Sequence, residues 1–203
     1  MNKKTIAIGS LSILFILLLI LIKTNSIESF DTSIYNLIAM HINANLTDFF
    51  KFMTFLGEGV SIANFCVLAL IVTFILKKRN IGLIVAGCVT FNSLFSEGLK
   101  RIIQRPRPEI LRLINESSYS FPSSHTLASV SLCGIFLYFV LKSSLDKKLR
   151  IVISAILIIL PILIGISRIY LGVHNASDVL GGMILAIILL LIEISIIEKN
   201  ELF

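Results

Sequence analysis

Six long apolar runs, separated by short polar segments, constrain this chain more than any other feature. Hydrophobic residues make up 56% of the 203 positions and charged residues only 15%, a balance typical of membrane proteins rather than of soluble domains. A helix satisfies its backbone polar groups internally, as the hydrocarbon core of a bilayer requires. We therefore predict one all-α integral membrane domain over residues 1–203, a bundle of six transmembrane helices. The predicted spans cover residues 5–22, 62–76, 81–95, 126–141, 151–166 and 179–197.

The run at residues 5–22 has two interpretations, because an apolar stretch behind Lys3 and Lys4 is also how a secretory signal peptide begins. The run is uninterrupted by charge, and no pair of small residues with cleavage-site spacing follows it. These features favour a retained first span over a signal peptide.

Residues 33–53 have a different pattern from the spans. Apolar residues such as Ile34, Leu37 and Ile38 recur at steps of three and four, while Asn and charged residues occupy other positions. This period predicts an amphipathic helix after the first span, lying at the membrane interface. An ordinary loop helix packed on the bundle is the alternative.

Basic residues are distributed unevenly over the predicted loops, and the formal net charge is +6. If both termini are cytoplasmic, most of the 18 Lys and Arg residues lie in cytoplasmic segments, as the positive-inside rule requires. We therefore expect a multi-pass protein of the cell membrane with both termini in the cytoplasm. We expect no nucleic acid partner, because no soluble basic domain is present to carry the charge. The sequence carries no signal for an oligomeric state.

The outer connection between the third and fourth predicted spans is unusually basic between Lys100 and Arg112, against the positive-inside tendency. It reads LKRIIQRPRPEI near its start and ends with FPSSH, directly before the fourth span. By themselves, the cations are explained by contact with lipid headgroups or water, and the serines by a helix cap. A helix that begins there, however, also points unpaired N–H groups outward, and such groups favour an anion.

A third polar segment, SRIYLGVHNASD, lies at residues 167–178 between the last two spans. His174 and Asp178 are four residues apart and would share one face of a helix. By itself, Asp178 is explained as a favourable first-turn acid, and Arg168 as a cation at a span end. One topology nevertheless puts all three polar segments on the same side of the membrane. Cations, N–H groups, hydroxyls and imidazoles together are what phosphoryl transfer needs.

These three segments resemble the tripartite signature of the type-2 phosphatidic acid phosphatase superfamily, the lipid phosphate phosphatases. That signature reads K-x6-RP, then PSGH, then SR-x5-H-x3-D, and this chain is similar to it in order and spacing. The matching residues are Lys100, Arg107 and Pro108; Pro122, Ser123, Ser124 and His125; and Ser167, Arg168, His174 and Asp178. Ser124 is the one departure, because the family usually has glycine there, and glycine would be favoured if the position required a positive φ angle.

The resemblance implies a catalytic role for three of these residues. His174 would attack phosphorus and form a phosphohistidine, for which its imidazole must be neutral. Asp178 would accept a hydrogen bond from the other ring nitrogen and stabilise the ring as it becomes positive. His125 would protonate the leaving oxygen and then activate water for the second step.

The resemblance also implies a phosphate cradle. Its cations exceed the charge of about −2 on a phosphate monoester, so we expect a metal-independent site with no cofactor. Glu109 and Glu116 are expected to be isolated loop acids rather than magnesium ligands. The residues of the cradle would be Lys100, Arg107 and Arg168, completed by Ser123 and Ser124.

The expected function is that of a membrane phosphatase acting on lipid phosphates or diphosphates at the outer face. Undecaprenyl diphosphate and phosphatidylglycerophosphate are the favoured substrates. A non-catalytic carrier of lipid phosphates or anions is an alternative, although a carrier needs cations but no oriented imidazole. A phosphatase for soluble substrates would share the same residues. A zinc site made by His125, His174 and Asp178 is a further alternative, which the neighbouring cations disfavour.

Overall fold

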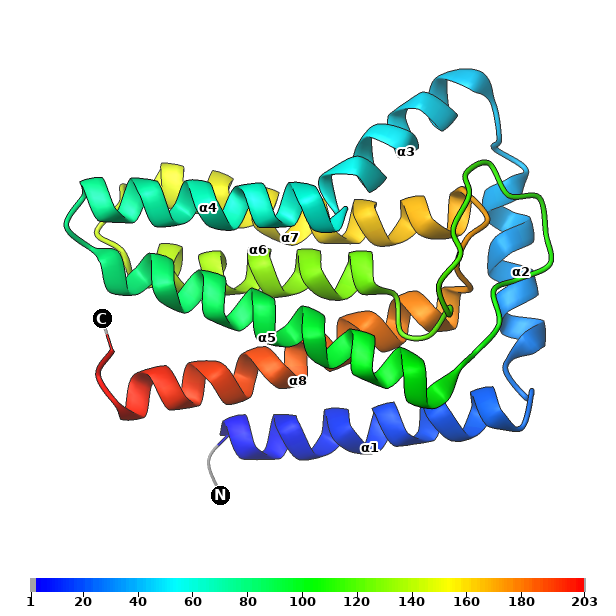
Figure 1. Ribbon diagram of the computed structural model, residues 1–203, viewed down its shortest axis with the longest axis horizontal. Coiled ribbons are helices and arrows are strands. Elements are labelled where there is room, and N and C mark those ends of the chain that lie inside the picture. Colours follow the sequence, from blue (N-terminus) through cyan, green and yellow to red (C-terminus); the bar gives the residue numbers. More distant parts are fainter. Residues whose placement is uncertain (1–2, 203) are drawn as a thin grey trace.

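The structure, a computed structural model, describes residues 3–202 of the chain. Those residues form eight α-helices and no β-strand (Figure 1), which confirms the predicted all-α fold. The helices are α1 (Lys3–Lys23), α2 (Glu28–Ala39), α3 (Ala44–Leu56), α4 (Gly59–Ile75), α5 (Arg79–Ile103), α6 (Ser124–Lys142), α7 (Lys147–Tyr170) and α8 (Ala176–Lys199).

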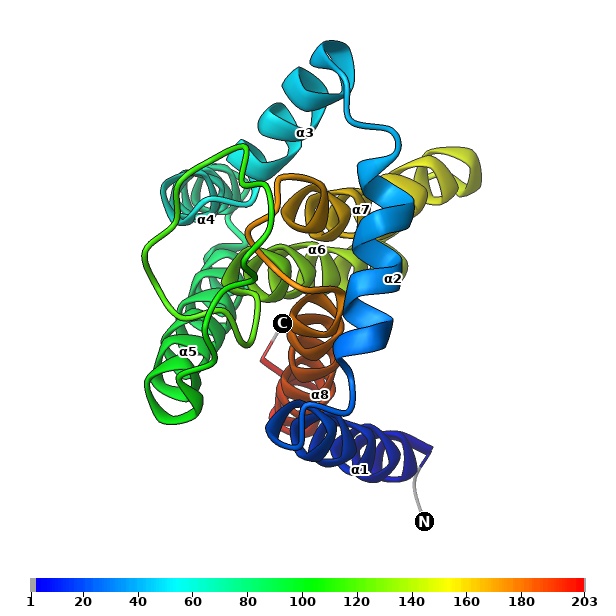
Figure 2. The same ribbon diagram turned by 90° about the vertical axis from the view of Figure 1, so that its right-hand side faces the viewer.

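Helices α1 and α4–α8 run along the long axis of the molecule, with α6 at the centre (Figures 1 and 2). Helix α6 packs against α5, α7 and α8. In its most apolar 18-residue stretch 56% of the residues are buried, against 17% in α1 and in α7. The exposed apolar surfaces of α1 and α7 are therefore the surfaces suited to contact with lipid.

Five helices, α1 and α5–α8, are long and apolar enough to cross a membrane. Helix α4 has 17 residues, about 26 Å of helix, which is slightly short of the ~30 Å hydrocarbon core. It follows α3 through a bend of 52°, and the two helices taken together as one bent segment are the sixth candidate span. Length and composition thus agree with the predicted bundle of six spans, of which the second is bent.

The predicted single amphipathic helix over residues 33–53 is wrong, because residues 40–43 separate it into α2 and α3. Asn43 accounts for the break: its backbone is extended, and its side chain accepts a hydrogen bond from Leu46 N at 3.0 Å, which caps α3. The Asn43 N–H donates to the Tyr170 hydroxyl on α7. Helix α2 lies across the ends of α7 and α8 (Figure 2), and its apolar face packs on them.

The first and last helices both have their free ends at one end of the bundle, here called the terminal end (Figure 1). The α5–α6 and α7–α8 connections lie at the opposite end, called the site end. Gly172 makes the α7–α8 turn possible, because its φ is 73° and a Cβ there would come within 2.0 Å of the Leu111 carbonyl oxygen. Leu113 N also donates to Leu171 O at 3.0 Å. The two connections are therefore held against each other.

Candidate active site

All three motif segments meet at the site end. The apolar run at residues 81–95 continues as α5 to Ile103, so Lys100 lies in the last helical turn rather than in a loop. The other predicted residues lie at helix ends or beside them: Arg107 in the α5–α6 connection, Ser123, Ser124 and His125 at the start of α6, Arg168 in the last turn of α7, and His174 and Asp178 at the start of α8.

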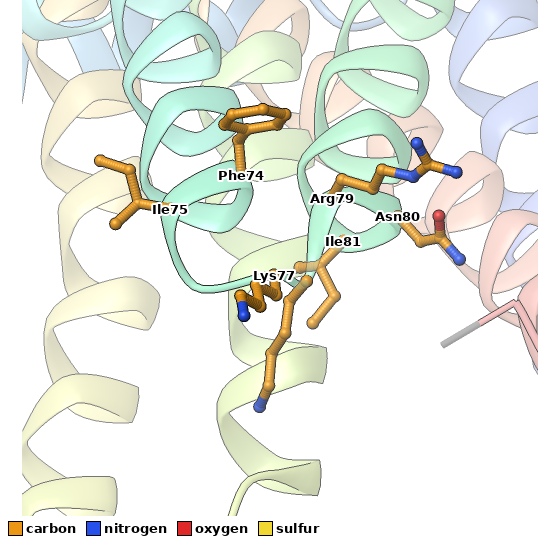
Figure 3. Close-up of a pocket in the computed structure, with 7 residues that line it drawn as sticks. Phe74, Ile75, Lys77, Arg79, Asn80 and Ile81 are labelled. Carbon is orange, nitrogen blue, oxygen red and sulfur yellow. The ribbon is translucent and has the colours of Figure 1, made fainter.

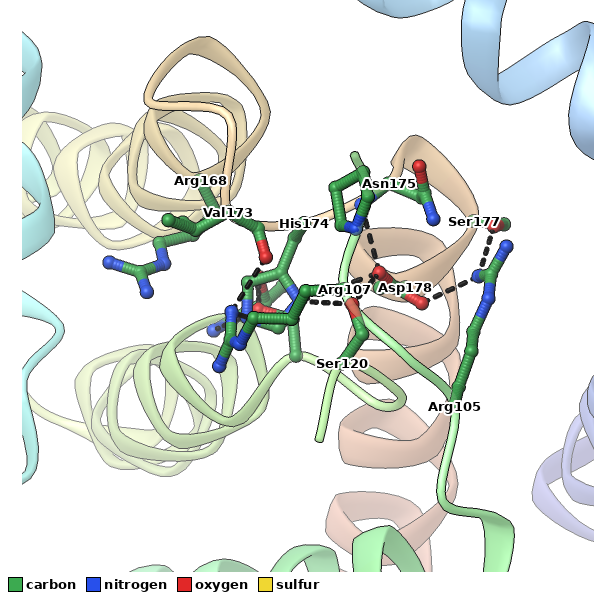
Figure 4. A network of polar contacts seen from close by, with 12 residues as sticks. Arg105, Arg107, Ser120, Arg168, Val173, His174, Asn175, Ser177 and Asp178 are labelled. Atoms are coloured by element: carbon green, nitrogen blue, oxygen red, sulfur yellow. Dashed lines mark hydrogen bonds and ion pairs between the residues drawn. The ribbon is translucent and has the colours of Figure 1, made fainter. Parts of the chain in front are cut away.

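His174, which lies just before the N-cap of α8, faces Asp178 in the first turn of that helix (Figure 4). His174 Nδ1 lies 3.5 Å from Asp178 Oδ2 and 3.4 Å from the Ser120 hydroxyl oxygen. Asp178 Oδ2 also accepts hydrogen bonds from the Ser120 hydroxyl and from Asn175 N, the latter at 2.8 Å. A capping box thus fixes the carboxylate, which is placed to hold a proton on Nδ1 of the imidazole.

The other ring nitrogen of His174 faces the cations. Its Nε2 lies 3.3 Å from Arg107 Nη1, and because arginine can only donate, this contact selects the neutral ring with its proton on Nδ1. Burial lowers the pKa of His174 to about 4; Asp178 opposes this shift, and Arg168 and Arg107 add to it. The imidazole is therefore neutral near pH 7, as a nucleophile must be.

Arg107 is held by several hydrogen bonds within the site. Its Nε donates to Ser118 O at 2.7 Å, and its Nη1 donates to Val173 O at 2.6 Å. Its Nη2 donates to the Ser118 hydroxyl at 3.0 Å, and the same hydroxyl accepts from Lys100 Nζ at 3.4 Å. Lys100 and Arg107, two of the predicted phosphate-binding cations, therefore both contact the Ser118 hydroxyl.

Glu116 corrects one expectation from the sequence, because it is not an isolated loop acid. One of its oxygens pairs with Arg168 Nη2, and the other lies 3.6 Å from Arg107 Nη2. Burial by itself would raise the pKa of Glu116, but the two guanidinium groups outweigh burial and hold the pKa below its ordinary value. The ionised carboxylate thus lies between two of the cations predicted to bind phosphate.

Two buried polar atoms at the site, His125 Nε2 and Arg168 Nε, have no hydrogen-bond partner among residues 3–202. The Nη atoms of Arg168, in contrast, donate to Glu116 and to the Thr54 hydroxyl. Buried donors and acceptors in proteins are nearly always paired. These two atoms therefore indicate where a polar ligand would complete the site.

Ser123 and Ser124 differ in what their polar groups contact. The Ser123 hydroxyl accepts from the Thr126 hydroxyl at 3.0 Å, and Ser123 N donates to Asp178 O at 3.1 Å. The predicted phosphate ligand Ser123 is thus used as the N-cap of α6. Ser124 is helical and does not have a positive φ angle, so serine in place of the family glycine introduces no backbone strain. Its hydroxyl lies 3.4 Å from that of Ser96.

Sequence reasoning missed several residues that hold the predicted ones. Arg105 donates to Asp178 Oδ1 at 2.6 Å and to Asp31 Oδ2 at 2.9 Å. The unusual density of cations after Lys100 is a signal for Arg105, but it does not specify a partner. Asp31 lies 74 positions away from Arg105 in the chain, and no local pattern connects them. The other missed residues are Thr54, Ser118 and Ser120.

The zinc alternative does not agree with the arrangement of the side chains. Within residues 3–202, no group of three or more His, Cys, Asp or Glu side chains is placed to hold a metal ion. His125, His174 and Asp178 therefore do not form the ligand set that this alternative requires.

Two pockets lie at opposite ends of the bundle. A pocket of about 480 Å³ opens at the site end between α1, α2 and the start of the α5–α6 connection, and Arg105, Arg107 and Asp31 line it. A pocket of about 840 Å³ lies in the α4–α5 turn at the terminal end (Figure 3). None of the predicted site residues lines this second pocket, so it is separate from the candidate active site.

The sequence is similar to known membrane phosphatases. The profile of the PAP2 superfamily matches residues 81–202. The chain is 31% identical over 198 residues to phosphatidylglycerophosphatase B of Bacillus subtilis, with 96% of each protein covered. It is 30% identical over 148 residues to dolichyldiphosphatase of Saccharomyces cerevisiae, covering 68% of this chain and 61% of the yeast protein.

Solved structures agree with the sequence matches. The crystal structure of a transmembrane PAP2 type phosphatidylglycerolphosphate phosphatase from Bacillus subtilis superposes with a TM-score of 0.88, at 30% identity and with 98% of both chains covered. The structure of Aquifex aeolicus LpxE gives a TM-score of 0.63 at 26% identity, covering 81% of this chain and 94% of that one. The hydrolase interpretation therefore holds over that of a carrier. This chain belongs to the PAP2 superfamily and is a membrane lipid phosphatase of that type.

Proposed function

We propose that this phosphatase removes the terminal phosphate from phosphatidylglycerophosphate or undecaprenyl diphosphate at the outer membrane face, through a phosphohistidine on His174. The arrangement of the His174 ring carries the proposal, with Nδ1 toward Asp178 and Nε2 toward Arg107. A site that only bound phosphate would need the cations but not a neutral imidazole oriented by a carboxylate.

The proposed reaction has two steps. In the first, His174 Nε2 attacks phosphorus, the bond from phosphorus to the lipid oxygen breaks, and His125 gives that oxygen a proton. Asp178 stabilises the positive charge that develops on the His174 ring. In the second step water attacks phosphorus, His125 takes a proton from the water, and the P–N bond breaks. The products are inorganic phosphate and either phosphatidylglycerol or undecaprenyl monophosphate.

Lys100, Arg107 and Arg168 bind the non-bridging oxygens in this proposal. Their positive charge neutralises the phosphate group as its bond to the leaving oxygen breaks. These three side chains therefore supply the electrostatic stabilisation of the transition state. The unpartnered Arg168 Nε and His125 Nε2 gain partners when the phosphate binds. Glu116 must yield at least part of its contact with the two arginines, because it and the phosphate require the same donors.

The choice of substrates draws on the relatives. One relative is a phosphatidylglycerophosphatase and another a dolichyldiphosphatase, and undecaprenyl diphosphate is a polyprenyl diphosphate like the substrate that the second name states. The apolar surfaces of α1 and α7 allow a lipid tail to stay in the bilayer while its phosphate reaches the site end. Basic residues at the terminal end, among them Lys77, Lys78 and Arg79, favour the cytoplasm for that end and the outer face for the site.

The test is purified protein against phosphatidylglycerophosphate, undecaprenyl diphosphate, phosphatidic acid and a soluble sugar phosphate, with and without a metal chelator. The His174→Ala variant should lose turnover by roughly 10⁴-fold or more while orthovanadate still binds. Exposed His41 provides the matched control, and His41→Ala should keep full activity. Turnover that survives in His174→Ala would rule out the phosphohistidine, and turnover lost to the chelator would rule out the metal-independent cradle.

Cysteine labelling tests the proposed face independently of the chemistry. A cysteine at the exposed position Glu109, in a background without the three native cysteines, should react with an impermeant thiol reagent in intact cells. A cysteine at the exposed position Lys78 should react only after lysis. The reverse pattern would place the site on the cytoplasmic face.

A further inference from the structure

A second buried network adjoins the catalytic pair and has no part in the reaction described above (Figure 4). Arg105 Nη1 donates to Asp178 Oδ1 at 2.6 Å and to the Ser177 hydroxyl at 2.7 Å, while its Nη2 donates to Asp31 Oδ2 at 2.9 Å. One guanidinium group thus bridges two carboxylates. The exposed fraction of the side chain is 12% for Arg105, 5% for Asp31 and 0% for Asp178, so water screens this bridge weakly.

Asp31 belongs to α2, the helix that lies across the ends of α7 and α8. Its Oδ1 accepts from Ser177 N at 2.8 Å, and its Oδ2 accepts from the Ser177 hydroxyl at 2.6 Å. Ser177 is the second residue of α8. Asp31 therefore caps the first turn of α8 from another helix and lies near the positive end of its dipole. Helix α2 is thereby joined to the residue that precedes Asp178.

We propose that Arg105, held in place by Asp31, is a positioning residue for the reaction, and that α2 is therefore a functional part of the active site. The inference rests on the proposed function, because it gives Arg105 the task of orienting the partner of the nucleophile. Arg105 binds Oδ1 of Asp178, which leaves Oδ2 for His174, Ser120 and Asn175. It also places a positive charge against this buried carboxylate, which in the proposed reaction stabilises a positive His174 ring.

The charges around Asp178 explain why one arginine serves two acids. Arg105 and Arg107 face Asp178 from the α5–α6 connection, and His174 faces it from the α7–α8 turn. From α2, Asp31 contributes a second negative charge on the other side of the guanidinium. Three further charged residues, Lys23, Glu28 and Glu109, line the adjoining pocket.

Removal of the guanidinium would leave two buried carboxylates, Asp31 and Asp178, without the cation that bridges them. In that variant a proton on Asp178 would relieve the repulsion between the two acids. If Asp178 takes the proton, it can no longer stabilise a positive imidazole and the first step slows. A neutral residue in place of Asp31 would remove the repulsion and leave Asp178 ionised again. A neutral residue at Asp31 should therefore restore part of the activity that the loss of the Arg105 guanidinium removes, which an effect on packing alone does not predict.

Arg105→Gln, Asp31→Asn and the double variant test the inference with a short-chain phosphatidic acid in detergent micelles. We expect Arg105→Gln to lower kcat about 100-fold while KM changes less than about threefold, because the cradle cations remain. In a plot of kcat against pH, the fall in activity on the low-pH side, here called the acid limb, should move to higher pH by about one unit or more. The double variant should recover at least about tenfold of the lost kcat and return the limb toward its original pH.

Arg105→Lys provides a second route if the glutamine variant does not fold. A lysine keeps a positive charge but cannot bridge both carboxylates with separate nitrogens, so we expect an about tenfold lower kcat with an unmoved acid limb. The matched controls are exposed residues of the same types as Arg105 and Asp31. Arg101→Gln on α5 and Asp48→Asn on α3 should each behave as the unchanged protein.

Three results would overturn the inference: an unmoved acid limb in Arg105→Gln, a double variant whose losses simply multiply, or a rise in KM with unchanged kcat. His174→Ala measured in the same assay separates this inference from the proposed function. Turnover in His174→Ala would remove the phosphohistidine whatever Arg105 does. An inactive His174→Ala beside fully active Arg105 variants would remove the positioning role alone.

Discussion

Two clusters of basic residues lie at opposite ends of the bundle, and they differ in burial rather than in residue type. At the terminal end Lys77, Lys78 and Arg79 are exposed, in the α4–α5 turn and at the first residue of α5. Figure 3 labels Lys77 and Arg79. At the site end Arg107 and Arg168, both labelled in Figure 4, are 9% and 1% exposed. Carboxylate, carbonyl and hydroxyl groups surround them. Cationic side chains are therefore hydrated at the terminal end and largely shielded from water at the site end.

The difference shows which cations are prepared for a ligand. An exposed cation keeps its hydration and needs no protein partner, so the terminal-end cluster is sufficiently explained by headgroups and the positive-inside rule. A buried cation loses hydration and is costly unless hydrogen bonds and opposite charge replace it. At Arg168 that replacement is incomplete, because Nε has no partner among the described residues. Incomplete compensation at a buried cation distinguishes a ligand site from structural charge.

The largest expected difference in activity is between a variant that lacks one buried cation of the site end and a variant that lacks one exposed cation of the terminal end. Arg168→Gln should lower kcat/KM for a lipid phosphate by about 10³-fold, because a guanidinium group that is shielded from water stabilises transition-state charge strongly. Lys78→Gln removes the same formal charge from the exposed cluster and should stay within about twofold, since water screens it. Steady-state kinetics on short-chain phosphatidic acid measure both.

The comparison fails if the two variants lose similar activity. A similar small loss would mean that net charge near the membrane, rather than the buried cage, attracts the substrate. Thermal melting of both variants provides the necessary control, because a variant that unfolds loses activity for another reason. Glu116, which Arg168→Gln leaves with Arg107 alone, is 25% exposed and can be partly hydrated.

The sequence was sufficient to predict the spans and the meeting of the three motifs, because both depend on local pattern. Apolar runs specify membrane helices whatever their neighbours are. Span ends on the same membrane face of a small bundle must also lie close together. The position of Lys100 was less predictable, because the polar sequence at the end of α5 is equally compatible with a helix and with a loop. The break between α2 and α3 depends on the Asn43 cap and its contact with Tyr170, which the apolar period does not reveal.

The residues that hold the site were not predictable, because their partners are far away in the chain. Asp31 contacts Ser177 across 146 positions, and Glu116 contacts Arg168 across 52. Nothing in the composition around either acid indicates which cation or helix end it will meet. A family signature identifies the groups that match its pattern, whereas the groups that orient them depend on how one particular chain folds back on itself.

The pH dependence sharpens the comparison further, with a smaller expected effect. His174 must be neutral to attack, and burial together with Arg168 and Arg107 lowers its pKa to about 4. The acid limb of kcat/KM should therefore lie near pH 4, after correction for the phosphate's own ionisation near pH 6, and activity should fall as pH drops through that limb. In Arg168→Gln the limb should move upward, because a positive neighbour that disfavours the imidazolium is gone. Lys78→Gln should leave it in place, and a limb that moves equally in both would contradict the buried origin of the shift.

The smallest effect concerns the acid that compensates the buried cations. Glu116 lies between Arg168 and Arg107, where a phosphate would need the same donors, so Glu116→Gln should lower KM and the inhibition constant of orthovanadate by about three- to tenfold, an effect of roughly 1 kcal/mol. The same change leaves Arg168 buried with less opposite charge, which should lower the melting temperature, and added inorganic phosphate should restore it because phosphate binds only the folded state. The exposed acid Glu109 is the matched control, since Glu109→Gln should alter neither quantity. A higher KM in Glu116→Gln would show instead that this carboxylate orients the arginines for the phosphate and does not compete with it.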